Sequence, residues 1–431
     1  MKPRFGSVRV HGAFFICWFV SFRTYARILR RTMNKVSTDS KAIERFVSRS
    51  VEHIYPTPEK LGEVLKSGKQ ITVYLGIDPT GPSLHVGHAI AIRKLAELQQ
   101  LGHKVILLIG DFTAMIGDPT DKLATRKPLT REEVLANCKS YKEQASSMLK
   151  FDGENPAELR FNSEWLAKMS FADVVELAAH FTVQQMLERD MFEKRIAEEK
   201  PVGLHEFLYP LMQGYDSVAM DVDLEIGGND QTFNMLAGRT LMREVKQKEK
   251  FVLTCKLLAD ATGKKMGKTE GNMITLGDAP EDMYGKVMSW TDGMILPGFE
   301  LCTNVSSDDI SKIAAQMKAG ENPMTFKKQL AQEVVATFVS SEAAEQASAH
   351  FVQVHQKGEA PTEITEWKLG ASSKLVDVLV ESGLVSSKTD ARRQIEQGGV
   401  RVNDVVETED VVDVKVGDVI QKGKRHFVKL V

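Results

Sequence analysis

Two histidines in residues 74–95 have the spacing of an anion-binding site. His85 and His88 stand on either side of Gly87, where a predicted strand gives way to a predicted helix. The first turn of a helix offers backbone N–H groups and the positive end of the helix dipole, which favour a phosphate. Glycine at this point lets a ligand approach the backbone closely. The segment predicts a phosphate site with two imidazole donors, although an isolated HxGH would as readily be two ordinary histidines.

A second candidate motif lies far downstream, at residues 261–272, which read ATGKKMGKTEGN. Three lysines here stand among three glycines. Such a loop can close over a triphosphate and stabilise the charge that develops on it. A run of charge alone is more often a solvated surface. Both motifs in one chain, in this order, favour nucleotide chemistry.

The elements around the first motif indicate an α/β fold. Residues 71–77 and 104–110 are short apolar runs rich in strand formers, and residues 87–101 between them have helical periodicity. This order is a β-α-β unit, which predicts a doubly wound parallel sheet. Such sheets bind ligands at the carboxyl ends of their strands, so we expect the site there.

The middle of the chain is mostly helical. Thr130 and Glu133 form a capping-box pattern that opens a helix toward Leu149. Residues 170–200 read as further helices, followed by a strand at residues 222–226.

After about residue 278 no strand pattern recurs until the end of the chain. Residues 308–318 and 327–339 read as amphipathic helices, and residues 357–371 as a linker containing glycine and proline.

The composition of the 431-residue chain fits a globular protein of several domains, at roughly 100 to 200 residues each. Lys and Arg number 56 against 58 Asp and Glu, so the net charge of −2 gives no general attraction to nucleic acid. The 4 cysteines are far apart without a CxxC pair, which argues against a disulfide framework and fits the cytoplasm. We see no set of metal ligands in the sequence.

Residues 1–32 differ from the rest of the chain, because they are basic and the first acidic residue is Asp39. The apolar run at residues 13–20 is shorter than the ~20 residues that span a bilayer, so we predict no membrane segment. We expect a basic extension outside the fold, with Met33 as the start codon in use. A transit peptide and a structured extension are the alternatives.

Five segments resemble successive signatures of the bacterial tyrosyl-tRNA synthetases, which are class I aminoacyl-tRNA synthetases: YLGIDPTGPSLHVGH, GDFTAMIGDPT, EFLYPLMQGYD, EIGGNDQTFN and KKMGKT. The resemblance covers about residues 40–431, with HVGH and KMGKT as variants of the HIGH and KMSKS motifs. It implies an enzyme that activates L-tyrosine with ATP to tyrosyl-adenylate and pyrophosphate, and then transfers tyrosine to the 3′ end of tRNA(Tyr). It also implies a cytoplasmic homodimer.

The fold implied by this resemblance is a Rossmann-type (HUP-like) doubly wound sheet with a helical insertion that carries the dimer interface. An α-helical domain and a small α+β RNA-binding domain of the S-four type would follow. The expected ranges are 33–278 for the catalytic domain, about 125–205 for its insertion, 279–360 for the helical domain and 361–431 for the C-terminal domain.

The resemblance assigns one group of residues to ATP, which is a substrate and is expected to bring Mg²⁺. The histidines would contact its phosphates and ribose, and the lysines of KMGKT the departing pyrophosphate. Asp78 would otherwise form an Asx turn with Pro79, and Thr80 would be a plain loop residue. The implied catalytic residues are His85, His88, Lys122, Arg126, Lys265, Lys268 and Thr269. The implied ATP-binding residues are Gly76, Asp78, Thr80, His85, Gly87, His88, Lys265 and Lys268.

A second implied group binds tyrosine. Tyr74 and Asp216 would bind the phenol, and other polar residues would hold the α-amino group and close the pocket. Steps of four and three along a helix return to one side, so positions 209, 213 and 216 should share a face. The alternatives are satisfied core groups and, after the strand, a plain turn. The implied amino-group residues are Asp118, Tyr209 and Gln213, and the closing residues are Asp230 and Gln231.

The last residues of the chain carry the signal for an RNA partner. Residues 374–407 read as two short helices and a hairpin, with Lys388, Arg392 and Arg393 grouped on the second helix. This resembles the S-four-type RNA-binding domain. Acidic residues in the same span offset the basic ones, so a salt-bridged surface is the alternative.

Three other functions compete with the leading one. A tryptophanyl enzyme of the same subclass is disfavoured by Tyr74, Asp216 and the C-terminal module. A non-catalytic RNA-binding protein is disfavoured by the intact HVGH and KMGKT motifs. An HxGH nucleotidyltransferase of cofactor synthesis would explain the first motif but neither KMGKT nor the RNA module.

Overall fold

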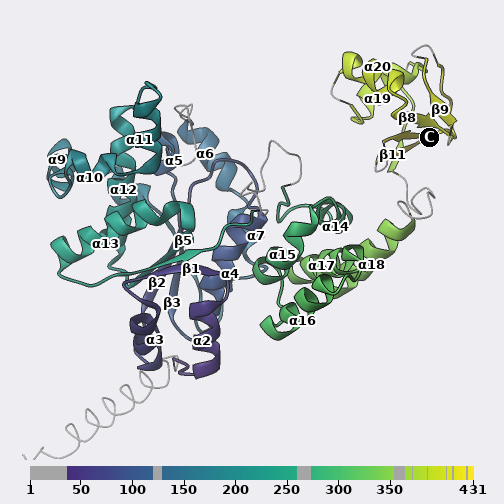
Figure 1. Ribbon diagram of the computed structural model, residues 1–431. Coiled ribbons are helices and arrows are strands. Elements are labelled where there is room, and N and C mark those ends of the chain that lie inside the picture. The colour runs from purple at the N-terminus through teal and green to yellow at the C-terminus, as the bar shows by residue number, and fades with distance from the viewer. Residues whose placement is uncertain are drawn as a thin grey trace, which may run out of the picture. The chain divides into compact units, whose positions relative to one another are not determined.

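The computed structural model describes residues 36–119, 129–259, 273–353, 365–370, 372–385, 387–403, 405–409, 412–423 and 426–431. The chain divides into two compact units. The first runs to Gly277 and also includes Leu296–Ile310, and the second comprises Asp278–Ile295 and Ser311–Val431. Figure 1 shows both units, with most of their elements labelled.

A six-stranded sheet forms the centre of the first unit, with the strand order β1-β6-β5-β2-β3-β4. All neighbours pair in parallel except β1, which runs antiparallel to β6 at the edge. The strands are β1 (Val51–Tyr55), β2 (Thr72–Ile77), β3 (Lys104–Ile109), β4 (Glu158–Phe161), β5 (Leu224–Gly228) and β6 (Phe251–Cys255). The central strands are buried and nearly all apolar, as expected for a parallel sheet covered on both faces.

The predicted β-α-β unit is confirmed to within a residue or two at each boundary. Helix α4 (Val86–Gln100) joins β2 to β3 and packs on β2, β3 and β5. The strand predicted at residues 222–226 is β5, which begins two residues later because Val222 and Asp223 complete the turn before it. Strand β4 was not predicted, since its four half-buried residues lack the long apolar run that marks β2 and β3.

Helices inserted between β3 and β5 confirm the expected helical middle of the chain. Thr130 and Glu133 close the predicted capping box, with the backbone N–H of Glu133 3.2 Å from Thr130 Oγ1. The single helix expected toward Leu149 is interrupted at Lys139 and Ser140. The helices here are α5 (Thr113–Ile116), α6 (Arg131–Cys138), α7 (Tyr141–Ala145), α8 (Ser163–Leu166), α9 (Phe171–Ala178), α10 (Val183–Leu187), α11 (Asp190–Ala197) and α12 (Leu204–Met220). Helix α13 (Thr232–Lys246) packs along α12 and against β5 and β6.

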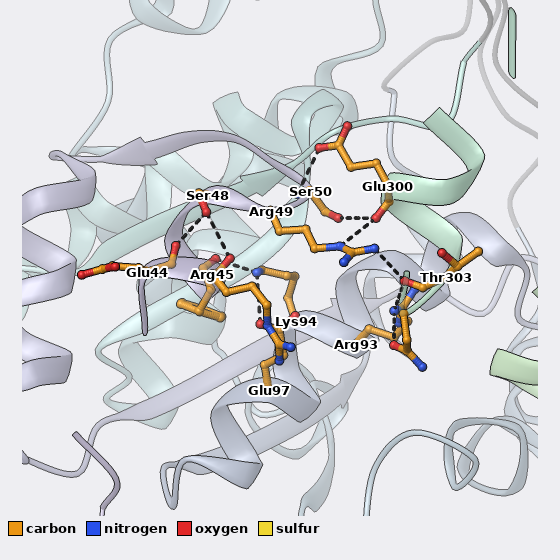
Figure 2. A network of polar contacts seen from close by, with 12 residues as sticks. Glu44, Arg45, Ser48, Arg49, Ser50, Arg93, Lys94, Glu97, Glu300 and Thr303 are labelled. Carbon is orange, nitrogen blue, oxygen red and sulfur yellow. Dashed lines mark hydrogen bonds and ion pairs between the residues drawn. The ribbon is translucent and has the colours of Figure 1, made fainter. Parts of the chain in front are cut away.

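Helix α15 (Ile295–Cys302) ends within the first unit, where two arginines hold its last carbonyls (Figure 2). Arg49 follows α2 (Ser40–Ser48), and Arg93 lies on α4. Both guanidinium groups donate to the carbonyl oxygen of Thr303, at 2.9 Å and 2.6 Å. The arginines thereby satisfy carbonyls that the end of a helix leaves without partners.

The second unit begins with helices and ends with a small α+β module. The helices are α14 (Pro280–Met288), α17 (Pro323–Phe338), α18 (Ser341–Phe351) and most of α16 (Ser307–Lys318), whose first turn belongs to the first unit. Helices α16 and α17 confirm the two that were predicted, whereas α14 was not. The module contains β7 (Thr365–Trp367), α19 (Leu375–Glu381), α20 (Lys388–Glu396), β8 (Val400–Val402), β9 (Val405–Glu407), β10 (Val419–Lys422) and β11 (His426–Leu430), in the sheet order β7-β11-β10-β8-β9.

Two short helices followed by the β8–β9 hairpin confirm the pattern predicted for residues 374–407. Within the described residues, no helix has both the length and the apolar character needed to cross a membrane.

Candidate active site

The strand order of the first unit reverses between β2 and β5. From β2 the chain moves outward through β3 and β4, then returns to the other side of β2 to form β5 and β6. The carboxyl end of β2 is therefore the point at which the order reverses, and open α/β sheets bind ligands at that point. Most of the implied site residues within the described ranges belong to segments that meet there.

The two histidines of HVGH cap helix α4 reciprocally. The backbone N–H of His88 donates to Nδ1 of His85 at 3.4 Å, and the backbone N–H of His85 donates to Nδ1 of His88 at 3.2 Å. The rings stack with 3.7 Å between their centroids. An Nδ1 atom that accepts a hydrogen bond carries no proton, so the proton of each neutral ring is on Nε2.

This arrangement corrects part of the expectation for the first turn of α4. The backbone N–H of His88 is used by the cap, and that of Val86 donates to the carbonyl oxygen of Ile274 at 3.0 Å. The phosphate-binding capacity of the turn therefore depends more on the imidazoles than on backbone donors. Gly87 is exposed, and a Cβ atom there would stand 3.0 Å from the ring of His85, so the glycine also makes room for the cap.

The segment that follows the lysine-rich motif is attached to the start of α4. Thr275 forms an antiparallel bridge with His85, and the backbone N–H of Leu276 donates to the carbonyl oxygen of Leu84 at 2.8 Å. The residues that come just after the second motif thus lie beside the first motif. Residues 260–272 and 120–128 lie outside the described residues. The predictions for Lys122, Arg126, Lys265, Lys268 and Thr269 consequently stay predictions.

Asp78, which follows β2, is a hub of hydrogen bonds between elements. Its Oδ1 accepts from Thr113 Oγ1 at 2.7 Å, and its Oδ2 accepts from the hydroxyl of Tyr209 at 2.8 Å. One residue implied for the nucleotide and one implied for tyrosine are therefore in direct contact. Gly76 and Thr80, on either side of Asp78, are exposed at the strand end.

The two residues implied for the phenol, Tyr74 and Asp216, are both buried. The Tyr74 hydroxyl lies 3.0 Å from Oγ of Ser217, the neighbour of Asp216 on α12. The Asp216 carboxylate accepts from Nε1 of Trp165 at 2.7 Å and from Nδ2 of Asn162 at 3.3 Å. Trp165 and Asn162 were not predicted, because nothing in the sequence near residue 160 marks a site.

The residues implied for the α-amino group lie in two places. Asp118 accepts from Gln231 Nε2 at 2.7 Å and from Nη2 of Arg189 at 3.0 Å. On α12, Gln213 donates to Oε1 of Glu225 at 3.1 Å. Arg189 was missed, since a single arginine among the helices of the insertion carries no motif. Asp230 lies over the end of β5, where a Cβ atom on Gly228 would stand 2.5 Å from its Oδ1.

Burial raises the pKa of three of these side chains. It raises the pKa of Asp216 well above its usual value, against the lowering effect of the hydrogen bonds from Trp165 and Asn162, and the charges of Glu225 and Asp78 raise it further. Burial also raises the pKa of Tyr74 and of Tyr209, to which Glu225 and Asp78 respectively add repulsion. Both phenols therefore carry a proton over the physiological range.

The basic residues predicted for RNA lie on α20 of the C-terminal module. Lys388 pairs with Asp377 at 2.8 Å and Arg393 with Asp390 at 2.5 Å, while each basic side chain keeps 63% of its surface exposed. The salt-bridged surface considered above is thus present, and the role of Lys388, Arg392 and Arg393 in RNA binding stays a prediction.

Within the described ranges, no group of three or more His, Cys, Asp or Glu side chains is arranged to hold a metal ion. Mg²⁺ commonly reaches such sites bound to substrate phosphates rather than in a protein cage.

Comparison with protein families gives two matches. The model of class I tRNA synthetases (W and Y) matches residues 66–356, and that of the S4 domain matches residues 373–420.

Curated relatives match at high coverage. The tyrosine–tRNA ligase of Carboxydothermus hydrogenoformans is 44% identical over 406 residues, which are 90% of this chain and 97% of the relative. That of Geobacter metallireducens is 46% identical over 382 residues, 86% of this chain and 94% of the relative.

Solved structures are similar in fold. The truncated mitochondrial tyrosyl-tRNA synthetase of Coccidioides posadasii matches with a TM-score of 0.59 and 25% identity, over 77% of this chain and 99% of its own. The enzyme of Archaeoglobus fulgidus, complexed with L-tyrosine, matches with a TM-score of 0.58 and 22% identity, over 72% of this chain and 100% of its own. At that identity the second likeness concerns the fold alone.

Proposed function

The chain belongs to the tyrosine–tRNA ligase family of class I synthetases, and we propose that its sheet-end site activates L-tyrosine with ATP for transfer to tRNA(Tyr). The observation that carries this proposal is the pair of capped histidines beside the segment that leaves the lysine-rich motif. That contact, which involves residues just after the lysine-rich motif, supports a shared nucleotide site at the switch point of the sheet.

In the first step, a carboxylate oxygen of tyrosine attacks the α-phosphorus of ATP. A new P–O bond forms, the bond to the β-phosphate oxygen breaks, and pyrophosphate leaves with its electron pair. The products are tyrosyl-adenylate and pyrophosphate, and no enzyme side chain becomes bonded to an intermediate. The protein therefore acts by positioning the reactants and by stabilising charge in the transition state.

The ATP half of the site is built on β2 and α4. His85 and His88 would donate from Nε2 to the phosphates, while exposed Gly76, Thr80 and Gly87 leave room for the nucleotide. Lys265, Lys268 and Thr269, with Lys122 and Arg126, would neutralise the leaving pyrophosphate. Mg²⁺ would enter bound to the ATP phosphates, which suits the oxygen ligands that this ion prefers.

The tyrosine half of the site is built on β2, α12 and the turn after β5. Tyr74 and Asp216 would bind the phenol of the substrate. Asp118, Tyr209 and Gln213 would hold its α-amino group, and Asp230 and Gln231 would close the pocket. The contact between Gln231 and Asp118 supports this grouping.

Transfer to RNA would use the S4-type module. Its exposed basic residues on α20 would contact phosphates in a salt-dependent manner, once RNA competes with their acidic neighbours. We place the activity in the cytoplasm, because scattered cysteines without a CxxC pair suit a reducing compartment. Cell fractionation checks this location.

We also propose that the chain forms a homodimer through its inserted helices. Phe171 on α9 is 84% exposed and Leu204 at the start of α12 is 81% exposed, with exposed Val175 and Val183 on α9 and α10. Large exposed apolar side chains of this kind mark interaction surfaces. Sedimentation should find a dimer for the native chain and a monomer for the variant Phe171→Asp with Leu204→Asp.

The function is tested by single-turnover formation of tyrosyl-adenylate in the His88→Ala variant. Loss of a preorganised donor should slow this step about 10- to 1000-fold, with little change in the Kd of tyrosine. Loss of tyrosine affinity at an unchanged rate would remove His88 from the phosphate site.

A further inference from the structure

A buried ion pair lies behind the tyrosine half of the site and is not used by any role described above. Lys250 immediately precedes β6, and Glu225 lies on β5. Their side chains are 0% and 3% exposed. The Lys250 ammonium contacts the Glu225 carboxylate, Oγ of Ser217 at 2.8 Å and the carbonyl oxygen of Met235 at 3.1 Å. Its three N–H groups thus have three acceptors, so this buried charge is fully satisfied.

Each end of the pair reaches a residue implied for tyrosine. Oγ of Ser217, which accepts from Lys250, lies 3.0 Å from the hydroxyl of Tyr74 at the phenol end. Oε1 of Glu225 accepts from Gln213 Nε2 at 3.1 Å at the amino end. The pair therefore connects to Tyr74 through two hydrogen bonds by way of Ser217, and to Gln213 through one.

The backbone around the ammonium leaves space for it and for little else. A Cβ atom on Gly238 of α13 would stand 2.5 Å from Nζ of Lys250 and 2.9 Å from Oγ of Ser217. A Cβ atom on Gly214 of α12 would stand 3.1 Å from the backbone nitrogen of Gly238. Because α12 and α13 approach closely at two glycines, the ammonium and the serine hydroxyl pack where a Cβ atom on Gly238 would clash with them.

The donor and acceptor roles around the ammonium follow from the chemistry of the groups. An ammonium can only donate, so Lys250 occupies one lone pair of Ser217. The serine proton is then directed to the oxygen of Tyr74. The Glu225 carboxylate is a further hydrogen-bond partner of the Tyr74 hydroxyl, so both members of the ion pair act on the orientation of this phenol.

A stabilising role alone does not account for the pair. Desolvation offsets the attraction within a buried ion pair, and apolar residues of similar volume often replace one without loss of stability. The distinctive property of a fixed, buried charge is that it orients the hydroxyl and amide groups bonded to it.

We infer that Lys250 and Glu225 are positioning residues for tyrosine, Lys250 by orienting Tyr74 through Ser217 and Glu225 by orienting Gln213. The inference rests on the proposed roles of Tyr74 and Gln213. Lys250 and Glu225 would thus contribute to specificity without contacting the substrate.

The test removes both charges together, because a single change would leave an unpaired buried charge and could prevent folding. The variant Lys250→Met with Glu225→Gln is compared with the native chain in tyrosine-dependent exchange of pyrophosphate into ATP. We expect the KM for tyrosine to rise at least about fivefold, the factor for one lost hydrogen bond. Discrimination between tyrosine and phenylalanine should fall by a similar factor, while the KM for ATP stays within about twofold.

A matched control comes from another deeply buried pair, Arg195 on α11 with Glu206 on α12. Their side chains are 1% and 4% exposed, and Arg195 also donates to the carbonyl oxygen of Pro201. The variant Arg195→Met with Glu206→Gln should leave both tyrosine parameters unchanged. Equal shifts in the two double variants, or no shift in the first, would overturn the inference.

A second measurement keeps the inference testable if the first double variant fails to fold. Ser217→Ala removes the hydroxyl that joins Lys250 to Tyr74 but keeps both charges of the pair, so it should lower discrimination against phenylalanine about fivefold and leave the KM for ATP unchanged. Native discrimination in this variant would overturn the inference. If the native chain itself shows no tyrosine-dependent exchange, the proposed function fails and the inference falls with it.

Discussion

Gly110 illustrates how the site depends on single residues at the ends of strands. It follows β3, next to the point where Asp78 follows the parallel strand β2. A Cβ atom at Gly110 would stand 2.0 Å from Oδ1 of Asp78 and 2.4 Å from Oγ1 of Thr113. The sequence predicts that Asp78 lies at a strand end. It does not predict that residue 110 must be glycine, because that requirement arises from the pairing of β2 with β3.

Replacing this glycine should displace the Asp78 carboxylate. We expect Gly110→Ala to lower the free energy of unfolding by about 1–3 kcal/mol, the usual cost of overpacking. Adenylate formation should also slow, because Asp78 would lose Thr113 and Tyr209 as partners. Urea denaturation and single-turnover kinetics measure the two effects. Gly62→Ala is the control, since a Cβ atom there meets nothing within 4 Å, and equal behaviour of the two variants would contradict the account.

Asp216 should make stability depend on pH. Because burial raises the pKa of this carboxyl in the folded chain, the folded state holds its proton more tightly than the unfolded state does. The residue's contribution to stability is therefore lost as the pH rises above about 4, the ordinary value for aspartate. Relative to the native chain, Asp216→Asn should gain stability progressively between pH 4.5 and pH 8 in urea denaturation. A difference that does not vary with pH would show that the carboxyl has an ordinary pKa.

At the scale of elements, helix α4 combines one feature that the sequence predicts with one that it does not. Its apolar periodicity and the HVGH motif predict its position to within a residue. Arg93, near its middle, donates to the carbonyl oxygens of Leu301 and Thr303 at the end of α15 (Figure 2). That partner lies about two hundred residues away, and local periodicity carries no signal for such a contact.

The arginine cap of α15 should contribute measurably to stability. Arg49→Met and Arg93→Met keep the apolar stem but remove charge-assisted hydrogen bonds, so each should cost about 1–3 kcal/mol of unfolding free energy. Because both arginines donate to the carbonyl of Thr303, the double variant should depart from the sum of the single ones. Urea denaturation gives all three values.

The control for this cap is Arg160→Met, which removes an exposed pair with Glu164 on the same sheet-bearing unit. Such pairs contribute at most about 1 kcal/mol. Losses at Arg49 and Arg93 no larger than that at Arg160 would mean that the helix end is satisfied in another way.

At the scale of the whole molecule, the C-terminal module has its own sheet and its own core. Its buried side chains come from Leu375 through Leu430 and form one cluster. The sequence predicts its helices and hairpin, because their alternation and turn signals are local. It does not predict β7, β10 or β11, whose short strands depend on pairing with distant segments. The predicted domain boundaries stay predictions.

Removing this module should separate the two steps of the reaction. Deleting residues 365–431 removes the whole sheet of the module but none of the implied adenylation residues. Tyrosine-dependent exchange of pyrophosphate should persist within about twofold, whereas charging of tRNA(Tyr) should fall steeply because phosphate contacts dominate affinity for nucleic acid. Deleting residues 1–32, which hold no motif, should change neither activity. Native charging by the C-terminal deletion would remove the module from RNA binding.

The central claim, that this sheet end selects and activates tyrosine, is tested most directly by the amino-acid specificity of pyrophosphate exchange in the native chain and in Tyr74→Phe. The account predicts exchange with tyrosine and far less with phenylalanine or tryptophan in the native chain. It also predicts that Tyr74→Phe reduces the preference for tyrosine over phenylalanine about tenfold, since a buried hydrogen bond to the substrate hydroxyl is lost. Equal exchange with tryptophan, or a preference for tyrosine unaltered in Tyr74→Phe, would contradict it.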